Sequence, residues 1–251
     1  MTLVAQAAGN YHFLPGGGTL PFCAGVIADP GYEIVRAVLH RPIPWREGFA
    51  LIERHLAALG RPRTALCAVE LRVGKPYTRE EFFAPDGFNG HYGELLRGWG
   101  LVADGVGSTA RTNIAVDLAP LPEQVLFAFS YTVPATDAPR TFVVSGVPEA
   151  PTVRPGETSP EALREKTSDI VATLDRRLAG LGVGWDQVTA VGLYTLYDLF
   201  PILRSEVLEP LGLAALNGIH WFHGRPPIDT TAIELDVRGI RTESRLGQLP
   251  A

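Results

Sequence analysis

Hydrophobic and polar positions along this chain predict the same series of elements twice. Each half shows a helix, a strand, a second helix and two further strands. In the first half these elements are predicted over 46–60, 64–73, around 88–92, 108–118 and 125–133. In the second half they are predicted over 160–181, 187–196, near 198–211, 217–223 and 231–240. Val188 takes the place in the second half that Leu66 takes in the first, so the repeating unit is a whole small domain.

Each long predicted helix carries one apolar stripe, which needs a sheet to cover it. In the helix 160–181 the apolar face holds Leu163, Ile170, Leu174, Leu178 and Leu181, and Arg164, Lys166, Asp175 and Arg177 lie elsewhere. Ser159-Pro160-Glu161 is a typical helix start. The pattern therefore predicts an α+β fold of two sandwich-like halves, each a mainly antiparallel sheet with two helices on one face. Pro134 and Asp137–Arg140 mark the boundary between a first domain, 1–134, and a second, 140–251.

Composition excludes several classes of protein. The net charge of −5 is spread along the chain, so no basic surface for nucleic acid is expected. The two cysteines, Cys23 and Cys67, lie in apolar stretches, which favours a reducing compartment. The chain has no apolar run of membrane-spanning length, and we expect a soluble, cytoplasmic protein. The scattered histidines form no metal-ligand spacing with the cysteines, so no metal is predicted.

Short motifs in both halves occur in a shared order. The second half carries Phe142–Gly146, ending in Ser-Gly, then Trp185–Val188 and Ile233–Asp236. The first half carries Tyr11, Phe22–Gly25, Asn89, Tyr92 and Ala110–Asn113. Together they resemble a tandem form of the Rid family (YjgF/YER057c/UK114). The resemblance implies RidA/chorismate-mutase-like halves, assembly as a trimer, and cofactor-free hydrolysis of reactive imines and enamines.

The same resemblance implies roles for individual residues. Arg111 occupies the carboxylate-binding position, and a guanidinium grips a carboxylate through two parallel hydrogen bonds. Glu234 occupies the position that holds water and moves a proton. The remaining substrate-binding positions fall on Asn113, Tyr11, Asn89, Ser145 and Gly146.

Arg111 and Glu234 belong to different halves. The Glu position of the first half is Ala128, and the Arg position of the second half is Asn217 or Gly218. One explanation is a site that combines both halves across a domain or subunit boundary; the other is that one site has degenerated. We favour the first, with Ser145 and Gly146 completing the pocket around Arg111.

The segment His220–His223 adds a second hypothesis for acid–base chemistry. Residues alternate in facing along a strand, so either His220 or His223 would point toward Glu234 and pair with it. The alternative is a buried aromatic strand with a satisfied histidine.

Several candidate residues also have structural explanations. Arg111 would pair with Asp104 or Asp117, Tyr11 and Tyr92 would pack in the core, and Asn89 would cap a helix. Cys67 is expected in the core and Cys23 beside the pocket, without a nucleophilic role. Gly16–Gly18 is expected to form a turn, and Arg225 to reach an anionic ligand.

These observations predict a hydrolytic deaminase of small imine or enamine carboxylic acids. One alternative is a chorismatase-like enzyme acting on a cyclic carboxylate, because chorismatases also resemble tandem Rid domains and use a late-strand Glu. A different class is a non-catalytic protein that binds small carboxylates. The partners expected are a small carboxylate-bearing substrate and further copies of the chain.

Overall fold

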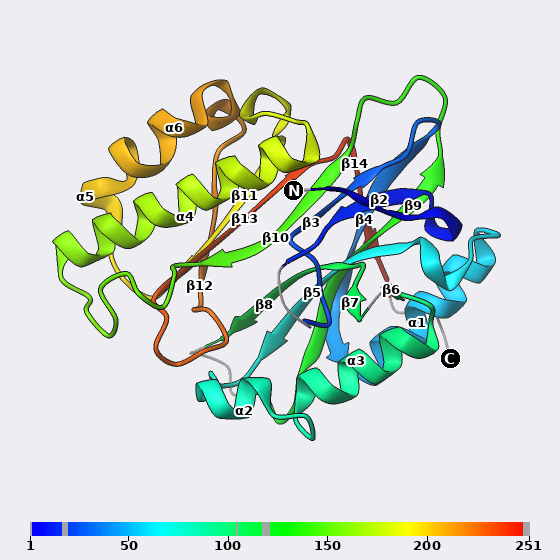
Figure 1. Cartoon of the computed structure of the whole chain (residues 1–251), viewed down its shortest axis with the longest axis horizontal. Helices are drawn as coiled ribbons and strands as arrows, with labels where there is room; N and C mark the ends of the chain where they lie inside the picture. The colour runs from blue at the N-terminus through cyan, green and yellow to red at the C-terminus, as the bar shows by residue number, and fades with distance from the viewer. Residues whose placement is uncertain (1, 17–19, 104, 117–120, 248–251) are drawn as a thin grey trace.

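Two sheets lie face to face in the centre of the molecule, and helices cover the outer face of each (Figure 1). The computed structural model describes residues 2–16, 20–103, 105–116 and 121–247. The seven-stranded sheet has the order β1 (Val4–Gln6), β2 (Tyr11–Leu14), β3 (Gly25–Ala28), β10 (Phe142–Pro148), β13 (Ile233–Gly239), β11 (Ala190–Thr195), β12 (His220–His223). The five-stranded sheet has the order β14 (Thr242–Leu246), β4 (Tyr32–Pro44), β9 (Val125–Pro134), β5 (Leu66–Val73), β8 (Ala110–Ala115). A short hairpin, β6 (Val102–Ala103) and β7 (Val106–Gly107), stands apart.

The strand topology repeats in the two halves. The order β4-β9-β5-β8 matches β10-β13-β11-β12, and in both series two antiparallel pairs are followed by one parallel pair. The parallel pairs are those whose connection contains a helix, as a crossover requires. The predicted α+β fold with mainly antiparallel sheets is therefore confirmed.

The outer strands do not follow the division at residues 134–140. Strand β3 pairs with β10 of the second half, and β14 returns to pair with β4 of the first half. Backbone ladders thus join each sheet to the other half of the chain. The predicted domain boundary separates the helices and the four repeated strands of each half. It does not apply to β1, β2, β3 and β14, which belong to the sheet of the other half.

The helices agree with the apolar pattern where they are long. Helix α4 covers Pro160–Leu181; the Ser159 hydroxyl accepts from the Ala162 N–H at its start, and Gly182 ends it at a φ of 69°. Helices α1 (Trp45–Ala58) and α3 (Phe88–Gly98) pack on the five-stranded sheet. A short helix, α2 (Arg79–Phe83), precedes α3 and begins with a capping box.

The second helix of the second half is broken into turns. It consists of α5 (Phe200–Leu203), a π-helical turn over Arg204–Leu208 and α6 (Glu209–Leu211). A 3₁₀ segment, Gly212–Asn217, follows, and the strand expected over 217–223 begins at His220. Prolines at the start of α5 and α6, and Gly212 with a φ of 56°, explain the breaks.

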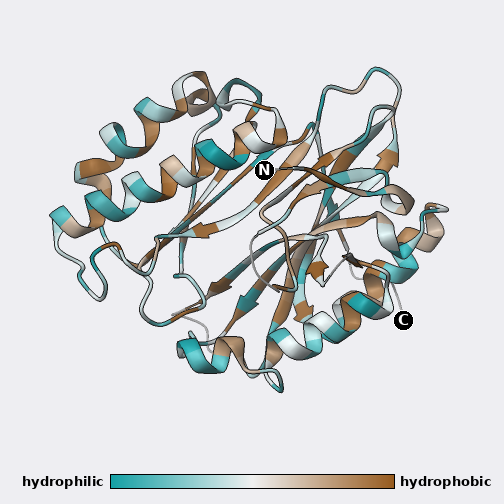
Figure 2. Cartoon of the chain, viewed as in Figure 1, coloured by the Kyte–Doolittle hydropathy of each residue, from teal (hydrophilic) through white to brown (hydrophobic). Residues whose placement is uncertain are grey.

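Apolar side chains form a core on both faces of each sheet. Helix α4 turns its apolar face toward the seven-stranded sheet, visible as brown bands on a teal helix in Figure 2. A third cluster, including Phe13, Cys67 and Val143, lies between the sheets. None of the helices in the described part of the chain has the length and apolar character needed to cross a membrane.

A buried layer of charges also joins the two sheets. Glu70 on β5 accepts two hydrogen bonds from Arg36 on β4, at 2.6 and 2.7 Å, and lies 3.3 Å from Arg238 on β13. Arg238 also donates to Asp236, which accepts from Thr112 on β8. Although burial raises the pKa of Glu70, Arg238 and Arg36 outweigh that effect and lower it to about 2.

Removing Glu70 should therefore weaken the whole fold. Glu70→Ala leaves each of these two buried arginines with one carboxylate partner instead of two, and we expect the free energy of unfolding to fall by about 3 kcal/mol. Because the pKa of Glu70 is depressed, its contribution is complete above pH 4.5 and is lost as the pH falls toward 2. Glu53→Ala, which removes an exposed pair with Arg63, is the control and should cost about 0–1 kcal/mol. Urea unfolding measures both; equal losses would contradict this role.

Candidate active site

A β-bulge in β10 brings the two sheets into contact. The register of β10 against β13 shifts between Val144 and Val147, which leaves Ser145 and Gly146 outside the regular ladder. The Ser145 hydroxyl accepts the Arg111 backbone N–H at 2.9 Å and donates to the Cys23 carbonyl at 2.7 Å. Bulges of this kind commonly redirect side chains next to functional sites. Here the bulge fixes β8 of one sheet against β10 of the other.

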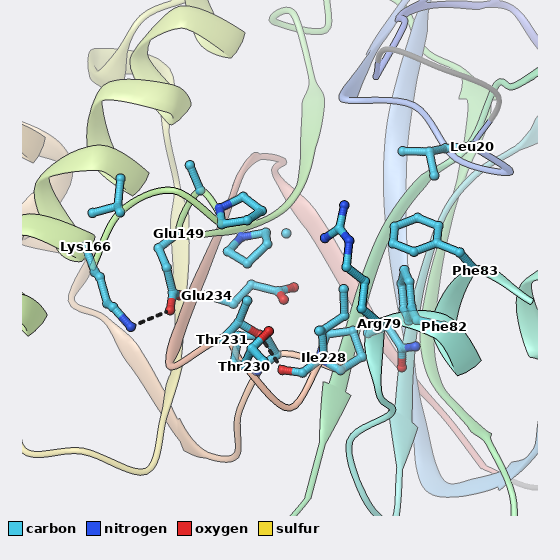
Figure 3. A pocket seen from close by; sticks show the side chains of 18 of the residues that line it. Leu20, Arg79, Phe82, Phe83, Glu149, Lys166, Ile228, Thr230, Thr231 and Glu234 are labelled. Carbon is cyan, nitrogen blue, oxygen red and sulfur yellow. Dashed lines mark hydrogen bonds and ion pairs between the residues drawn. The ribbon is translucent and has the colours of Figure 1, made fainter. Parts of the chain in front are cut away.

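A cavity of about 470 Å³ opens beside this bulge. Its walls come from both sheets, from α2 and α4, and from the loop before β13. Figure 3 shows Arg79, Phe82 and Phe83 on one side, with Glu149, Lys166 and Glu234 on the other. The volume is typical of sites for small molecules. Both Arg111 and Glu234 line this cavity within one chain, although they lie in different halves of the sequence.

Arg111 is held in place by polar and aromatic neighbours. Its Nη1 donates to Asn89 Oδ1 at 2.7 Å, and its guanidinium lies 4.1 Å from the centre of the Phe22 ring and 5.1 Å from that of Tyr92. It is only 5% exposed, and within the described ranges no carboxylate forms an ion pair with it. Burial lowers the pKa of Arg111 to about 10, so the group stays charged at neutral pH. A buried cation of this kind favours an anionic ligand.

Glu234 lies on β13, directly against the bulge. A Cβ atom added to Gly146 would lie 1.8 Å from Glu234 Oε1, so the carboxyl group occupies the space that a side chain would need. Glu234 is 3% exposed. Burial, and secondarily the charge of Asp236, raise the pKa of Glu234 to about 8, although Arg111 opposes the shift. The group is therefore largely protonated at neutral pH, which suits a general acid.

Three further cationic side chains line the cavity. Lys166 on α4 lies 3.1 Å from Glu149 Oε1, and both are buried. Glu149 also accepts the N–H groups of Ala232 and Ile233. Arg177, also on α4, is half-buried, and Arg79 on α2 is exposed and lies over the Phe83 ring. Lys166 and Glu149 neutralise each other, whereas the arginines give the cavity a positive character.

The structure divides the other predicted substrate-binding residues into three groups. Gly146 and Asn113 line the cavity. Ser145 and Asn89 do not line it, but each hydrogen-bonds to Arg111 and so positions that residue. Tyr11 is fully buried and bonds to Leu66 and Ser108. It is therefore a packing residue, and its predicted role in substrate binding is wrong.

The predicted pair between a histidine and Glu234 does not form. Strand β11 lies between β12 and β13, so His220 and His223 are separated from Glu234 by a whole strand. Both histidines are exposed, and neither lines the cavity. The prediction assumed that the strand of the two histidines lies next to the strand of Glu234, but the neighbour of β12 is β11. The two histidines therefore lie outside this cavity.

Other expected residues lie away from the cavity or outside the described part of the chain. Cys23 and Cys67 are buried free thiols, and burial raises the pKa of Cys23 to about 12. Arg225 donates to the carbonyls of Asp229 and Thr231 within its own loop. Asp104, Asp117 and the glycines at 17 and 18 lie outside the described residues. Within the described ranges, no three His, Cys, Asp or Glu side chains are placed to share a metal ion.

Comparison with known proteins assigns the chain to a family. The family model for 2-aminomuconate deaminase CnbZ matches residues 3–244. The chain belongs to the CnbZ family. A 2-amino-5-chloromuconate deaminase of Comamonas testosteroni is 36% identical to this CnbZ-family chain over 97% of it and 98% of the relative.

Two solved structures are more distant from this CnbZ-family chain. A chorismatase is 12% identical, with a TM-score of 0.43, over 86% of this chain and 77% of its own. A YjgF/YER057c/UK114 protein of Mycobacterium tuberculosis is 15% identical, with a TM-score of 0.29, over 40% of this chain and 79% of its own. Neither likeness carries an argument about function, and the tandem Rid relationship stays a prediction.

The sequence contained signals for two cavity residues of this CnbZ-family chain that its pattern analysis missed. Lys166 precedes Ile170 by one helical turn and so lies on the buried side of α4. A lysine on an apolar face indicates a buried partner or a site. Arg177 lies beside Leu178, at the edge of the same face. The expectation that both residues lie away from the apolar face was wrong for Lys166, which is buried, and missed the place of Arg177 at the edge of that face.

Replacing Gly146 should displace Glu234. Gly146→Ala places a methyl group where the carboxyl lies, and we expect unfolding free energy to fall by about 1–3 kcal/mol. The loss should shrink markedly in a Glu234→Ala background, which vacates the space. Gly98→Ala, where a Cβ would meet nothing within 4 Å, is the control and should change stability by less than about 1 kcal/mol. Urea unfolding of the four variants of the cycle measures the coupling; additive losses would place Glu234 elsewhere.

Proposed function

We propose that this protein is a hydrolytic deaminase of 2-aminomuconate or a closely similar enamine carboxylate. The observation that carries the proposal is the presence of Arg111 and Glu234 in one cavity: a buried cation without an acidic partner among the described residues, and a buried carboxyl that is protonated at neutral pH. Membership of the CnbZ family supports the choice of substrate.

The substrate suits these two groups. 2-Aminomuconate is a short conjugated diene with a carboxylate at each end and an amino group on the carbon beside one of them. Arg111 binds the carboxylate next to that carbon, because two guanidinium nitrogens match two carboxylate oxygens. Asn89 and the ring of Phe22 hold the guanidinium in its orientation. The amino-bearing carbon is thereby fixed relative to Glu234.

Glu234 acts first as an acid and then as a base. It donates its proton to a carbon of the diene, and the enamine becomes an imine in the same electron shift. The resulting carboxylate takes a proton from water, which adds to the imine carbon. Glu234 then donates this proton to the nitrogen of the tetrahedral carbon, and it takes the hydroxyl proton as the carbonyl forms and ammonia departs. One water is consumed, and one ammonia and one 2-oxo acid are released; Glu234 ends with its proton restored.

Aromatic rings and prolines form much of the remaining wall. The lining residues include Phe22, Phe82 and Phe83, together with Pro148 and Pro151. These apolar surfaces pack against a planar diene. They also reduce the number of waters near Glu234, and this desolvation keeps its pKa high.

Kinetic variants test the two roles separately. With 2-aminomuconate and ammonia release as the measurement, Arg111→Met should raise KM and lower kcat/KM by about 100-fold or more, because a charge-assisted double hydrogen bond is lost. Glu234→Gln should lower kcat by about 10²–10⁴ with little change in KM, because the amide fills the same space but transfers no proton. His220→Ala is the control and should match the wild type. Turnover that survives both site variants would refute the proposal.

The pH profile tests which form of Glu234 starts the reaction. Because the protonated acid is required, kcat/KM should be level below about pH 8 and fall roughly tenfold per pH unit above it. The Glu234→Gln variant should lose this fall in any residual activity. A rate that rises toward pH 8 would assign Glu234 the role of initial base instead. Binding of substrate without any turnover in the wild type would favour the non-catalytic binding hypothesis.

A further inference from the structure

Arg177 places a second cation beside Glu234. It extends from α4 to the cavity wall, and its Nη1 donates to the Ser145 carbonyl at 3.1 Å and to the Ala24 carbonyl at 3.4 Å. Ser145 is the neighbour of Gly146, whose Cα faces the Glu234 carboxyl. The guanidinium of Arg177 therefore lies next to the bulge, as Arg111 does, but on a different wall.

Arg177 differs from Lys166 and Arg79 in having neither an acidic partner among the described residues nor full exposure to solvent. Lys166 is paired with Glu149, and Arg79 is exposed to solvent. In the described part of the chain Arg177 forms hydrogen bonds only to backbone carbonyls and has no carboxylate within ion-pair distance. Burial lowers the pKa of Arg177 to about 10, as it does for Arg111. The buried Arg111 and the half-buried Arg177 thus line one cavity with the neutral acid Glu234.

We propose that Arg177 binds the second carboxylate of a dicarboxylate substrate, so that the cavity selects acids charged at both ends. The inference rests on the proposed function, which assigns the first carboxylate to Arg111. A dianion compensates both cations at once, whereas a monocarboxylate leaves Arg177 without a counter-charge. The apolar wall of Phe22, Phe82 and Pro148 packs on the unsaturated chain that separates the two carboxylates.

A pair of stable acids separates the contribution of the second charge. trans,trans-Muconate and sorbate share the same conjugated chain, but sorbate carries a methyl group where muconate has its second carboxylate. Calorimetry at pH 7 should show that the wild type binds muconate at least about tenfold more tightly than sorbate. Arg177→Met should bring the two affinities together, mainly by weakening muconate. Arg111→Met should weaken both acids.

The ratio of the two affinities distinguishes loss of the Arg177 charge from a structural effect of the substitution. Loss of the hydrogen bonds to Ser145 and Ala24 would weaken both acids equally, so only a change in the ratio of affinities supports the inference. Arg176→Met removes the neighbouring arginine of α4, whose Nη2 bonds to Thr173 and which does not line the cavity, and should keep the wild-type ratio. If Arg177→Met does not fold, Arg177→Lys serves, with a smaller fall in the same ratio.

Contrary outcomes are distinct from failure of the proposed function. Equal affinities in the wild type, or an unchanged ratio in Arg177→Met, overturn the inference. A ratio lost in Arg79→Met instead assigns the second carboxylate to Arg79 and also overturns it. Deamination of 2-aminomuconate is measured separately: turnover without preference for muconate overturns only the inference. Preference for muconate that depends on Arg177, without turnover, supports the inference and refutes the proposed function.

Discussion

The hydroxyl group of Ser145 is the contact on which the geometry of the pocket depends. It accepts the backbone N–H of Arg111 from one sheet and donates to the carbonyl of Cys23, which leads into the other. Arg111 and Glu234 belong to different sheets, so their separation is only as fixed as the contact between those sheets. The bulge in β10 makes this contact possible, because in a regular strand Ser145 and Gly146 would be paired with β13 in the ladder. The ion pairs of Glu70 hold the same two sheets elsewhere in the interface.

Desolvation gives the pocket its chemical character. Taking a charge out of water is unfavourable, and the buried groups differ in their charge state and in their partners. Glu70 remains ionised because Arg36 and Arg238 pair with it directly, whereas burial and the charge of Asp236 favour the protonated form of Glu234. Arg111 and Arg177 remain charged without an acidic partner within the described residues. The same burial is therefore accompanied by an ionised carboxylate, a protonated carboxyl and two arginines without an acidic partner among the described residues.

The sequence was most informative where local pattern decides structure. Helix α4 matches its prediction from Pro160 to Leu181, since its cap, apolar spacing and terminal glycine are all local signals. The association of Arg111 with Glu234 and Gly146 was also expected, from the resemblance and not from spacing. Sheet order is a long-range property, so the neighbour of β12 and the destination of β3 and β14 were not foreseen. The error about His220 and His223 follows from that, because facing along a strand is local but strand adjacency is not.

The exchanged outer strands affect how the chain acquires its fold during synthesis. Strand β4 lies early in the chain, yet its partner β14 begins at Thr242, and the hairpin of β2 and β3 has no place to pair until Phe142 has been made. A nascent first half would therefore present open sheet edges for most of the time of translation. Contacts so distant along the chain slow folding and leave those edges available for wrong pairing. Neither sheet can therefore be completed before strands from both halves of the chain have been made.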